Sequence, residues 1–149
     1  MQYAEGRIGR VFYVRIDHGE DLMKELEDFA REEEIRCGVI QVLGAVREAR
    51  MVTGPEVAVL PPDPHFEEVS GGWEVVGLGS ILWSGGAPKI HLHAAAGRGV
   101  STRAGCVREH AGVYIIIEAI ITEVTGFSAT RGHDPSTGMD LPQFPGRRP

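Results

Sequence analysis

The segment VYIIIEAIITEV at residues 113–124 constrains the fold of this chain more than any other stretch. It is dense in β-branched residues, which favour a strand over a helix because a helix restricts their χ1 angles. Glu118 shares one face of this strand with Tyr114, Ile116 and Ile120, so its carboxylate needs a partner. We expect a salt bridge or a subunit contact there. The alternative is that Glu118 orients a metal ligand or transfers a proton near the histidines described below.

The rest of the sequence predicts about seven strands and one clear helix, which together indicate an α+β fold. The helix is predicted within residues 17–35, where apolar side chains recur at helical spacing. Gly44 is expected to let its strand bend. The other predicted strands cover residues 10–16, 37–52, 72–84 and 87–97, with two short strands on either side of a prolyl loop at residues 61–64.

Composition and charge narrow the function classes. The 149 residues suffice for one domain with a real core. No apolar run approaches the roughly 20 residues of a membrane span, and the N-terminus lacks a signal-peptide pattern, so we expect a cytoplasmic protein without membrane contact. The formal net charge of -6 repels nucleic acid at long range and disfavours direct DNA binding. Cys37 and Cys106 are too few for a disulfide framework, so each is a core residue or a ligand.

The stretch KIHLHAAAGRGVSTRAGCVREHAG at residues 89–112 holds the candidate metal ligands. His91 and His93 lie two residues apart, so on a strand both point to the same side. Cys106 and His110 follow a turn-like segment, and a hairpin would bring their strand alongside the first pair. Two imidazoles and a thiolate with an open position suit zinc first, or iron, cobalt or nickel. The alternative is that Cys106 is a buried apolar residue and the histidines only form hydrogen bonds.

Several motifs in this order resemble the plants and prokaryotes conserved (PPC) domain, a domain of unknown function. The resemblance covers roughly residues 7–142, as a single domain, and leaves residues 143–149 as a flexible tail. The motifs that carry it are IDHGEDLMKELEDFAREEEI, GVIQVLGAVREARM, PKIHLHAAAGR, AGC and the pattern R-x-x-D-x-x-T-G at Arg131, Asp134, Thr137 and Gly138.

The resemblance implies a strongly curved, mostly antiparallel sheet with one main helix and a few short ones, assembled as a homotrimer. Plant relatives join the domain to AT-hook segments that contact DNA. We expect no hook here, because the final Gly146-Arg147-Arg148-Pro149 departs from the Arg-Gly-Arg-Pro order. Prokaryotic relatives often carry His-x-His followed by Gly-Gly-His. These positions correspond to His91, His93 and Ala104-Gly105-Cys106, with cysteine in place of the last histidine and His110 as a substitute ligand.

Three functions are compatible with these observations. The first, which we favour, is a PPC-type homotrimeric module that associates with DNA or with protein partners and carries a metal site. The second is a small zinc-dependent lyase or hydrolase in which Glu118 or Glu109 acts as the base. The third is a sensor in which Arg15, Arg47 or Arg131 holds an anionic metabolite at a subunit boundary.

Overall fold

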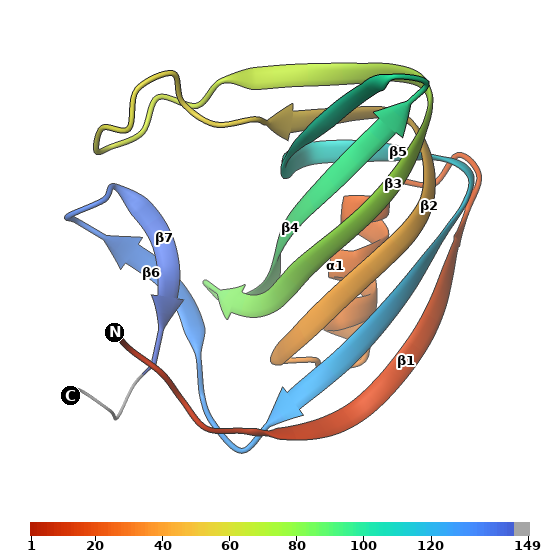
Figure 1. Cartoon of the computed structure of the whole chain (residues 1–149). Coiled ribbons are helices and arrows are strands. Elements are labelled where there is room, and N and C mark those ends of the chain that lie inside the picture. The colour runs from red at the N-terminus through yellow and green to blue at the C-terminus, as the bar shows by residue number, and fades with distance from the viewer. Residues whose placement is uncertain (145–149) are drawn as a thin grey trace.

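The computed structural model describes residues 1–144 and contains seven strands and one helix in that range (Figure 1). In chain order the elements are β1 (Arg7–Asp17), α1 (Leu22–Glu32), β2 (Cys37–Val52), β3 (Phe66–Ser84), β4 (Ala87–Arg98), β5 (Ser101–Thr125), β6 (Thr130–Asp134) and β7 (Met139–Gln143). The strand count and the main helix agree with the prediction.

Two expectations about secondary structure are wrong. The fold is mainly β rather than α+β, because the described residues contain no helix besides α1. The short strand predicted before the prolyl loop also does not form, and β3 begins only at Phe66. Pro61, Pro62 and Pro64 explain the missing strand, because proline lacks the backbone N–H that a strand ladder needs.

The strands form one curved sheet that is antiparallel except for a parallel bridge between Trp83 of β3 and Thr130 of β6. β2 lies between β3 and β5, and β4 also pairs with both of these strands. These four strands therefore close into a barrel-like ring. β1 extends the sheet beyond β5, and the β6–β7 hairpin extends it beyond β3 (Figure 1).

The isoleucine-rich segment forms the second half of β5, between β1 and β2. Ile117, Ala119 and Ile121 are completely buried there. The predicted bend at Gly44 is confirmed, since the pairing of β2 with β5 shifts register directly after it. Gly44 has a φ of 140° and lies against the backbone oxygen of Ile116, so a side chain would not fit.

Helix α1 covers one face of the sheet and packs Leu22, Leu26 and Ala30 into the core against β4 and β5. Asp21 caps its first turn by accepting a hydrogen bond from the backbone N–H of Lys24 at 2.9 Å. The same carboxylate accepts from the backbone N–H of Ala111 in β5 at 3.1 Å. The helix start is thus fixed to the strand that carries Cys106.

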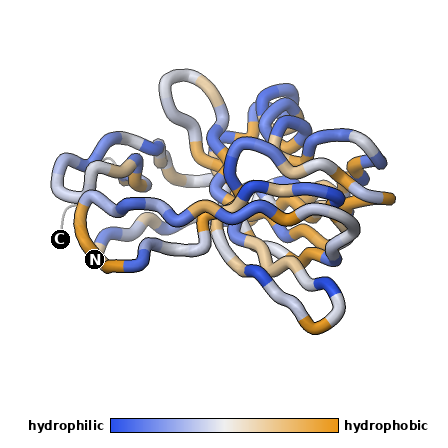
Figure 2. The backbone as a smooth tube through the Cα atoms, turned by 90° about the horizontal axis from the view of Figure 1, so that it is seen from above, coloured by the Kyte–Doolittle hydropathy of each residue, from blue (hydrophilic) through white to orange (hydrophobic). Residues whose placement is uncertain are grey.

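The opposite face of the sheet is apolar but exposed. Along β2, Ile40 and Val42 are buried, whereas Val39 and Leu43 point to the other side. Side chains of cross-strand partners share a face, so the exposed residues of neighbouring strands form one surface. We call this surface the open face; its large apolar members, from 40% exposed at Val39 to 68% at Tyr13, are Val11, Tyr13, Val39, Leu43, Val76 and Leu78. Figure 2 shows the alternation of hydrophobic and hydrophilic residues along the strands.

None of the described residues belongs to a helix with the length and apolar character needed to cross a membrane. The boundaries of a single domain at residues 7–142 stay a prediction. Most of the predicted flexible tail, including the Gly146–Pro149 motif, lies outside the described residues.

Candidate metal centre

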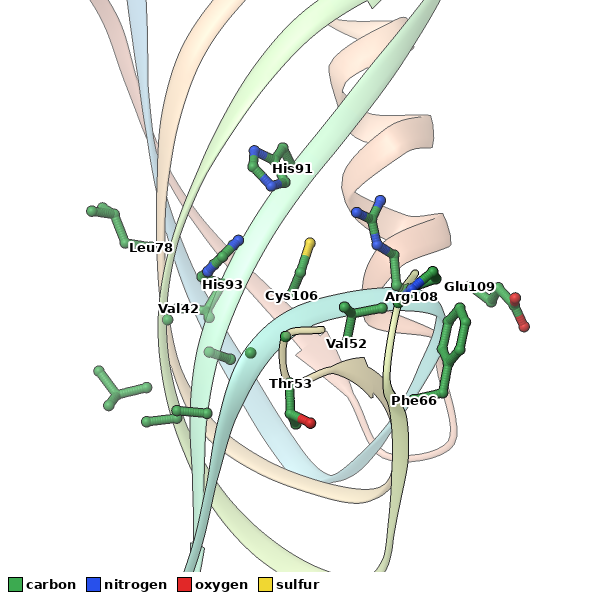
Figure 3. Close-up of a pocket in the computed structure, with 18 of the residues that line it drawn as sticks. Val42, Val52, Thr53, Phe66, Leu78, His91, His93, Cys106, Arg108 and Glu109 are labelled. Atoms are coloured by element: carbon green, nitrogen blue, oxygen red, sulfur yellow. The ribbon is translucent and has the colours of Figure 1, made fainter. Parts of the chain in front are cut away.

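Neighbouring strands of the β4–β5 hairpin bring His91, His93 and Cys106 together. The turn between Arg98 and Ser101 sets a register in which His93 lies directly opposite Cys106. His91 lies two residues before His93 and therefore projects from the same side of β4. One donor atom from each of the three residues lies within 4.8 Å of the others. Figure 3 shows both imidazoles and the thiol directed toward a common space.

The residues present fit a divalent transition metal. The two imidazole rings stand edge to face, with their centroids 5.0 Å apart and an interplanar angle of 87°. Tetrahedral zinc with two nitrogens and one sulfur holds its donors about 3.3–3.6 Å apart, given its usual bond lengths. The donor atoms, which lie within 4.8 Å of one another, would have to move closer together to reach that spacing. Cys106 is buried while His93 is exposed, so a bound metal would lie at the edge of the buried part of the structure.

The pKa values of His91 and Cys106 are shifted in opposite directions. Burial, together with the positive charge of Arg131, the neighbouring His93 and Arg108, lowers the pKa of His91 to about 4. His91 is therefore neutral at physiological pH, as a metal ligand must be. Burial raises the pKa of the Cys106 thiol, and the charges of Arg108 and Arg131 offset part of that rise. Without a metal, the thiol is protonated near neutral pH.

Metal affinity should therefore increase with pH. A metal that binds the thiolate must displace the thiol proton at any pH below the thiol pKa, so the apparent affinity for Co²⁺ should rise about tenfold between about pH 7 and about pH 8. Protonation of His91 does not contribute in this range, because its pKa is lowered to about 4. Competition titrations against a chelator measure this slope. An affinity that is flat across the range would argue against sulfur ligation.

A broad pocket of about 1370 Å³ adjoins the three ligands. Its walls are mostly apolar and come from β2, β3, β4, β5 and the loop before Phe66. Figure 3 shows Val52, Phe66 and Leu78 on these walls, with Arg108 beside Cys106 on β5. Three N and S donors at the edge of an apolar pocket can hold a metal and present its open position to a ligand.

His110 lies apart from the ligand cluster. Arg108 and Ala111 pair with the adjacent residues Arg50 and Ala49, so residues 109 and 110 form a bulge, and Glu109 has a φ of 63°. The bulge breaks the alternation that would have put His110 on the same face as Cys106. The choice of Cys106 as third ligand stays a prediction that the geometry favours.

The other predicted site residues are divided between the pocket and distant positions. Glu109 lines the pocket but forms an ion pair with Arg50 at 2.6 Å and points away from the ligands in Figure 3. Glu118 accepts a hydrogen bond from the hydroxyl of Tyr13 and does not line the pocket. Its partner is thus a tyrosine within the chain.

The three predicted anion-binding arginines also separate. Arg15 pairs with Asp17 at 2.8 Å, and Arg47 pairs with its neighbour Glu48 at 3.4 Å. Only Arg131 lies near the ligands, since its Nη2 donates to the Ser80 hydroxyl at 3.3 Å and Ser80 is the β3 partner of His91.

Arg108 is the residue of the site that sequence reasoning missed. It lies two positions after Cys106 on β5, so strand alternation alone was a sufficient signal. The loop at residues 53–65 was also missed, because no local pattern indicates that it closes one side of the pocket.

Comparison with known proteins identifies the family. The sequence pattern of the Plants and Prokaryotes Conserved domain, abbreviated PCC or PPC, matches residues 3–125. The chain belongs to the PPC family. Among solved structures, this PPC chain is similar to the metal-containing protein AF0104 of Archaeoglobus fulgidus, with 26% identity and a TM-score of 0.85 over 95% of this chain and 98% of that one.

Two further structures share the PPC fold. The PPC protein of Pyrococcus horikoshii is 19% identical with a TM-score of 0.84, and 99% of each chain is covered. A presumed DNA-binding protein of Ralstonia eutropha JMP134 is 22% identical with a TM-score of 0.75, covering 89% of this chain and 90% of that one. At these identities the similarity establishes the fold alone.

A curated relative is much longer. The chain is 29% identical over 136 residues to the bifunctional protein GlmU of Synechococcus sp. (strain JA-3-3Ab). The match covers 87% of this chain but spans 20% of that protein.

Proposed function

We propose that this chain is a homotrimeric PPC module that binds partners and holds one divalent transition metal ion per chain, zinc in the first place, at His91, His93 and Cys106. The observation that carries the proposal is the approach of the three donor atoms to within 4.8 Å at the edge of an apolar pocket. A bound metal would supply a fixed positive charge and an open position for a ligand. The metal-containing protein of Archaeoglobus fulgidus, which shares the fold, supports the presence of a metal in this chain.

The open face supports self-association. Its apolar side chains lie in rows across paired strands, such as the row of Tyr13, Ile120 and Leu78, which the polar Gln41 interrupts on β2. Leu43 and Val76 form a neighbouring pair on the same side. A contiguous exposed apolar surface is typical of an interface, because contact with another copy removes it from water. The family resemblance makes a trimer the expected assembly.

A charge on the open face should break the assembly. Val39 is 40% exposed and lies on β2, outside the lining of the pocket. Val39→Asp should weaken association by roughly a hundredfold or more, because burying an unpaired carboxylate at an apolar interface costs several kcal/mol. Light scattering across a concentration series measures this change.

Val100→Asp provides the matched control for this experiment. Val100 is fully exposed at the β4–β5 turn, away from the open face, so its replacement should leave the mass unchanged. Persistence of the wild-type assembly in Val39→Asp would contradict the open face as the interface. Metal binding should survive in the dissociated variant, since one chain supplies all three ligands.

Association with DNA is proposed to be indirect. The formal net charge of -6 opposes contact with phosphates, and two of the basic residues lie at positions 147 and 148, outside the described part of the chain. The presumed DNA-binding role belongs to a relative that shares the fold at 22% identity. A partner protein that contacts DNA reconciles the family relationship with the charge.

A lyase or hydrolase role has less support. It needs a base near the open metal position. Glu109 is neutralised by Arg50, and Glu118 lies outside the pocket against Tyr13. The pocket instead supports a binding function.

The proposed function is tested by elemental analysis and light scattering on the same preparation of the full chain. We expect close to one metal ion per chain and the mass of a trimer. A stoichiometry near zero after exposure to zinc would contradict the metal site, and a monomer would contradict the assembly.

A further inference from the structure

Two guanidinium groups flank the candidate ligands. Arg108 projects from β5 beside Cys106, and Arg131 is held against Ser80 opposite His91. The positive charges of both arginines act on His91 and on Cys106. Arg108 lines the pocket, whereas Arg131 lies near His91 but is not among the described lining residues.

Neither arginine has a carboxylate bonded to it within residues 1–144. Arg108 makes no hydrogen bond or ion pair there, and Arg131 donates to a backbone oxygen of Asp140 at 3.2 Å and to the Ser80 hydroxyl. The Nε of Arg131 is buried without a hydrogen-bond partner, and the Asp140 carboxylate acts on Arg131 only through space. The arginines of the described part that do pair with a carboxylate are Arg10, Arg15, Arg31, Arg36, Arg47, Arg50 and Arg103.

The pocket itself does not neutralise this charge. Glu109 is the one acidic residue among its described lining residues, and Arg50 already binds both of its oxygens at 2.7 and 2.6 Å. A divalent metal bound by a thiolate and two neutral imidazoles adds a further net positive charge. The result is a concentrated positive site in a chain of net charge -6, and such a site attracts small anions.

The other walls of the pocket are apolar and indicate that the anionic group belongs to a molecule with an apolar part. Val52 and Phe66 line the pocket, together with proline side chains of the loop at residues 53–65. Small-molecule pockets usually enclose about 300–1,000 Å³. The volume of about 1370 Å³ leaves room for an apolar group beyond the charged end.

We propose that the pocket binds an organic carboxylate whose charged end lies at the open metal position beside Arg108, with the charge of Arg131 nearby, and whose apolar body contacts Val52 and Phe66. This inference rests on the proposed metal site and names its ligand class. It separates the ligand from inorganic phosphate, which shares the charge but has no apolar body.

The test uses the full chain loaded with Co²⁺, whose visible spectrum reports changes in coordination. Phenylacetate is the probe, phenylacetamide is its neutral counterpart, and acetate and inorganic phosphate are anions without the apolar body. We expect phenylacetate to change the spectrum saturably and phenylacetamide to have no effect. Phenylacetate should bind at least about tenfold more tightly than acetate or phosphate, because the ring buries apolar surface.

Substitutions of the two arginines test which side chains recognise the carboxylate. Arg108→Gln should weaken phenylacetate binding roughly ten- to hundredfold, the usual effect of losing a charged hydrogen bond, at unchanged Co²⁺ stoichiometry. Arg131→Gln should weaken it less, because Arg131 acts through its charge and does not line the pocket. Arg7→Gln is the matched control, because Arg7 also has no described ion pair and lies on β1 outside the pocket lining.

The outcomes are distinguishable. Failure of the wild-type chain to take up Co²⁺ refutes the proposed function itself. Uptake of Co²⁺ with no response to phenylacetate, an equal response to phenylacetamide, or equal affinity for phosphate refutes this inference alone. Should an arginine variant fail to fold, the comparison of phenylacetate with phenylacetamide on the unaltered chain still decides the question.

Discussion

Replacing Cys106 with alanine should reduce Co²⁺ affinity by at least about a hundredfold and remove the intense near-ultraviolet absorption that a thiolate–cobalt bond produces. The reason is the loss of one of three donors; even partners that only orient a metal ligand are worth about ten- to hundredfold. His93 lies directly opposite Cys106 and would be left with His91 as the only other donor of the cluster. Absorption spectroscopy during Co²⁺ titration measures both effects.

Cys37→Ala is the matched control. Cys37 is the other free cysteine, half-buried at the start of β2, and burial raises the pKa of its thiol too. It does not belong to the ligand cluster, so its replacement should leave the cobalt spectrum unchanged. Wild-type absorption in Cys106→Ala, or its loss in Cys37→Ala, would contradict the assignment of the sulfur ligand.

Gly105→Ala should destabilise the chain and impair metal binding together. A Cβ at Gly105 would contact the backbone oxygen of Val52 and lie 2.9 Å from the carbonyl carbon of Val52 and 3.2 Å from the Cα of Thr53. Backbone atoms cannot rotate away as a flexible side chain can, so β2 and β5 must separate just where Val52 pairs with Cys106. Overpacking of this kind costs about 1–3 kcal/mol in free energy of unfolding.

Urea unfolding of the metal-free chain and Co²⁺ titration of the folded chain measure the two consequences. Gly97→Ala is the matched control, because Gly97 lies on the neighbouring strand β4 and a Cβ there would meet nothing within 4 Å. A Gly105→Ala variant with wild-type stability and cobalt affinity would show that the close approach of β5 to Val52 is not required.

Much of the ligand geometry was predictable from local patterns. Alternation on β4 puts His91 and His93 on one side, and the turn near Gly99 places Cys106 opposite His93. Both inferences need only the period of a strand and the length of a hairpin. The strand character of the isoleucine-rich segment followed in the same way from its β-branched residues.

The parts of the site that local patterns did not predict depend on deviations from the strand period and on contacts between residues far apart in the sequence. Glu109 adopts a positive φ that a non-glycine residue rarely shows, so the bulge that displaces His110 has no local signature. Arg131 reaches the site because Thr130 meets Trp83 across a parallel bridge, which no local pattern specifies. Arg108, in contrast, could have been predicted, because strand alternation puts it on the same face of β5 as Cys106.

X-ray absorption of the zinc-loaded chain tests the central claim most directly. We expect one sulfur at about 2.3 Å and two imidazole nitrogens at about 2.0–2.1 Å from the metal, with the rest of the shell made of lighter atoms. The sulfur contribution should disappear in Cys106→Ala and persist in Cys37→Ala. A shell without sulfur in the wild-type chain, or zinc that does not bind stoichiometrically, would contradict the site formed by His91, His93 and Cys106.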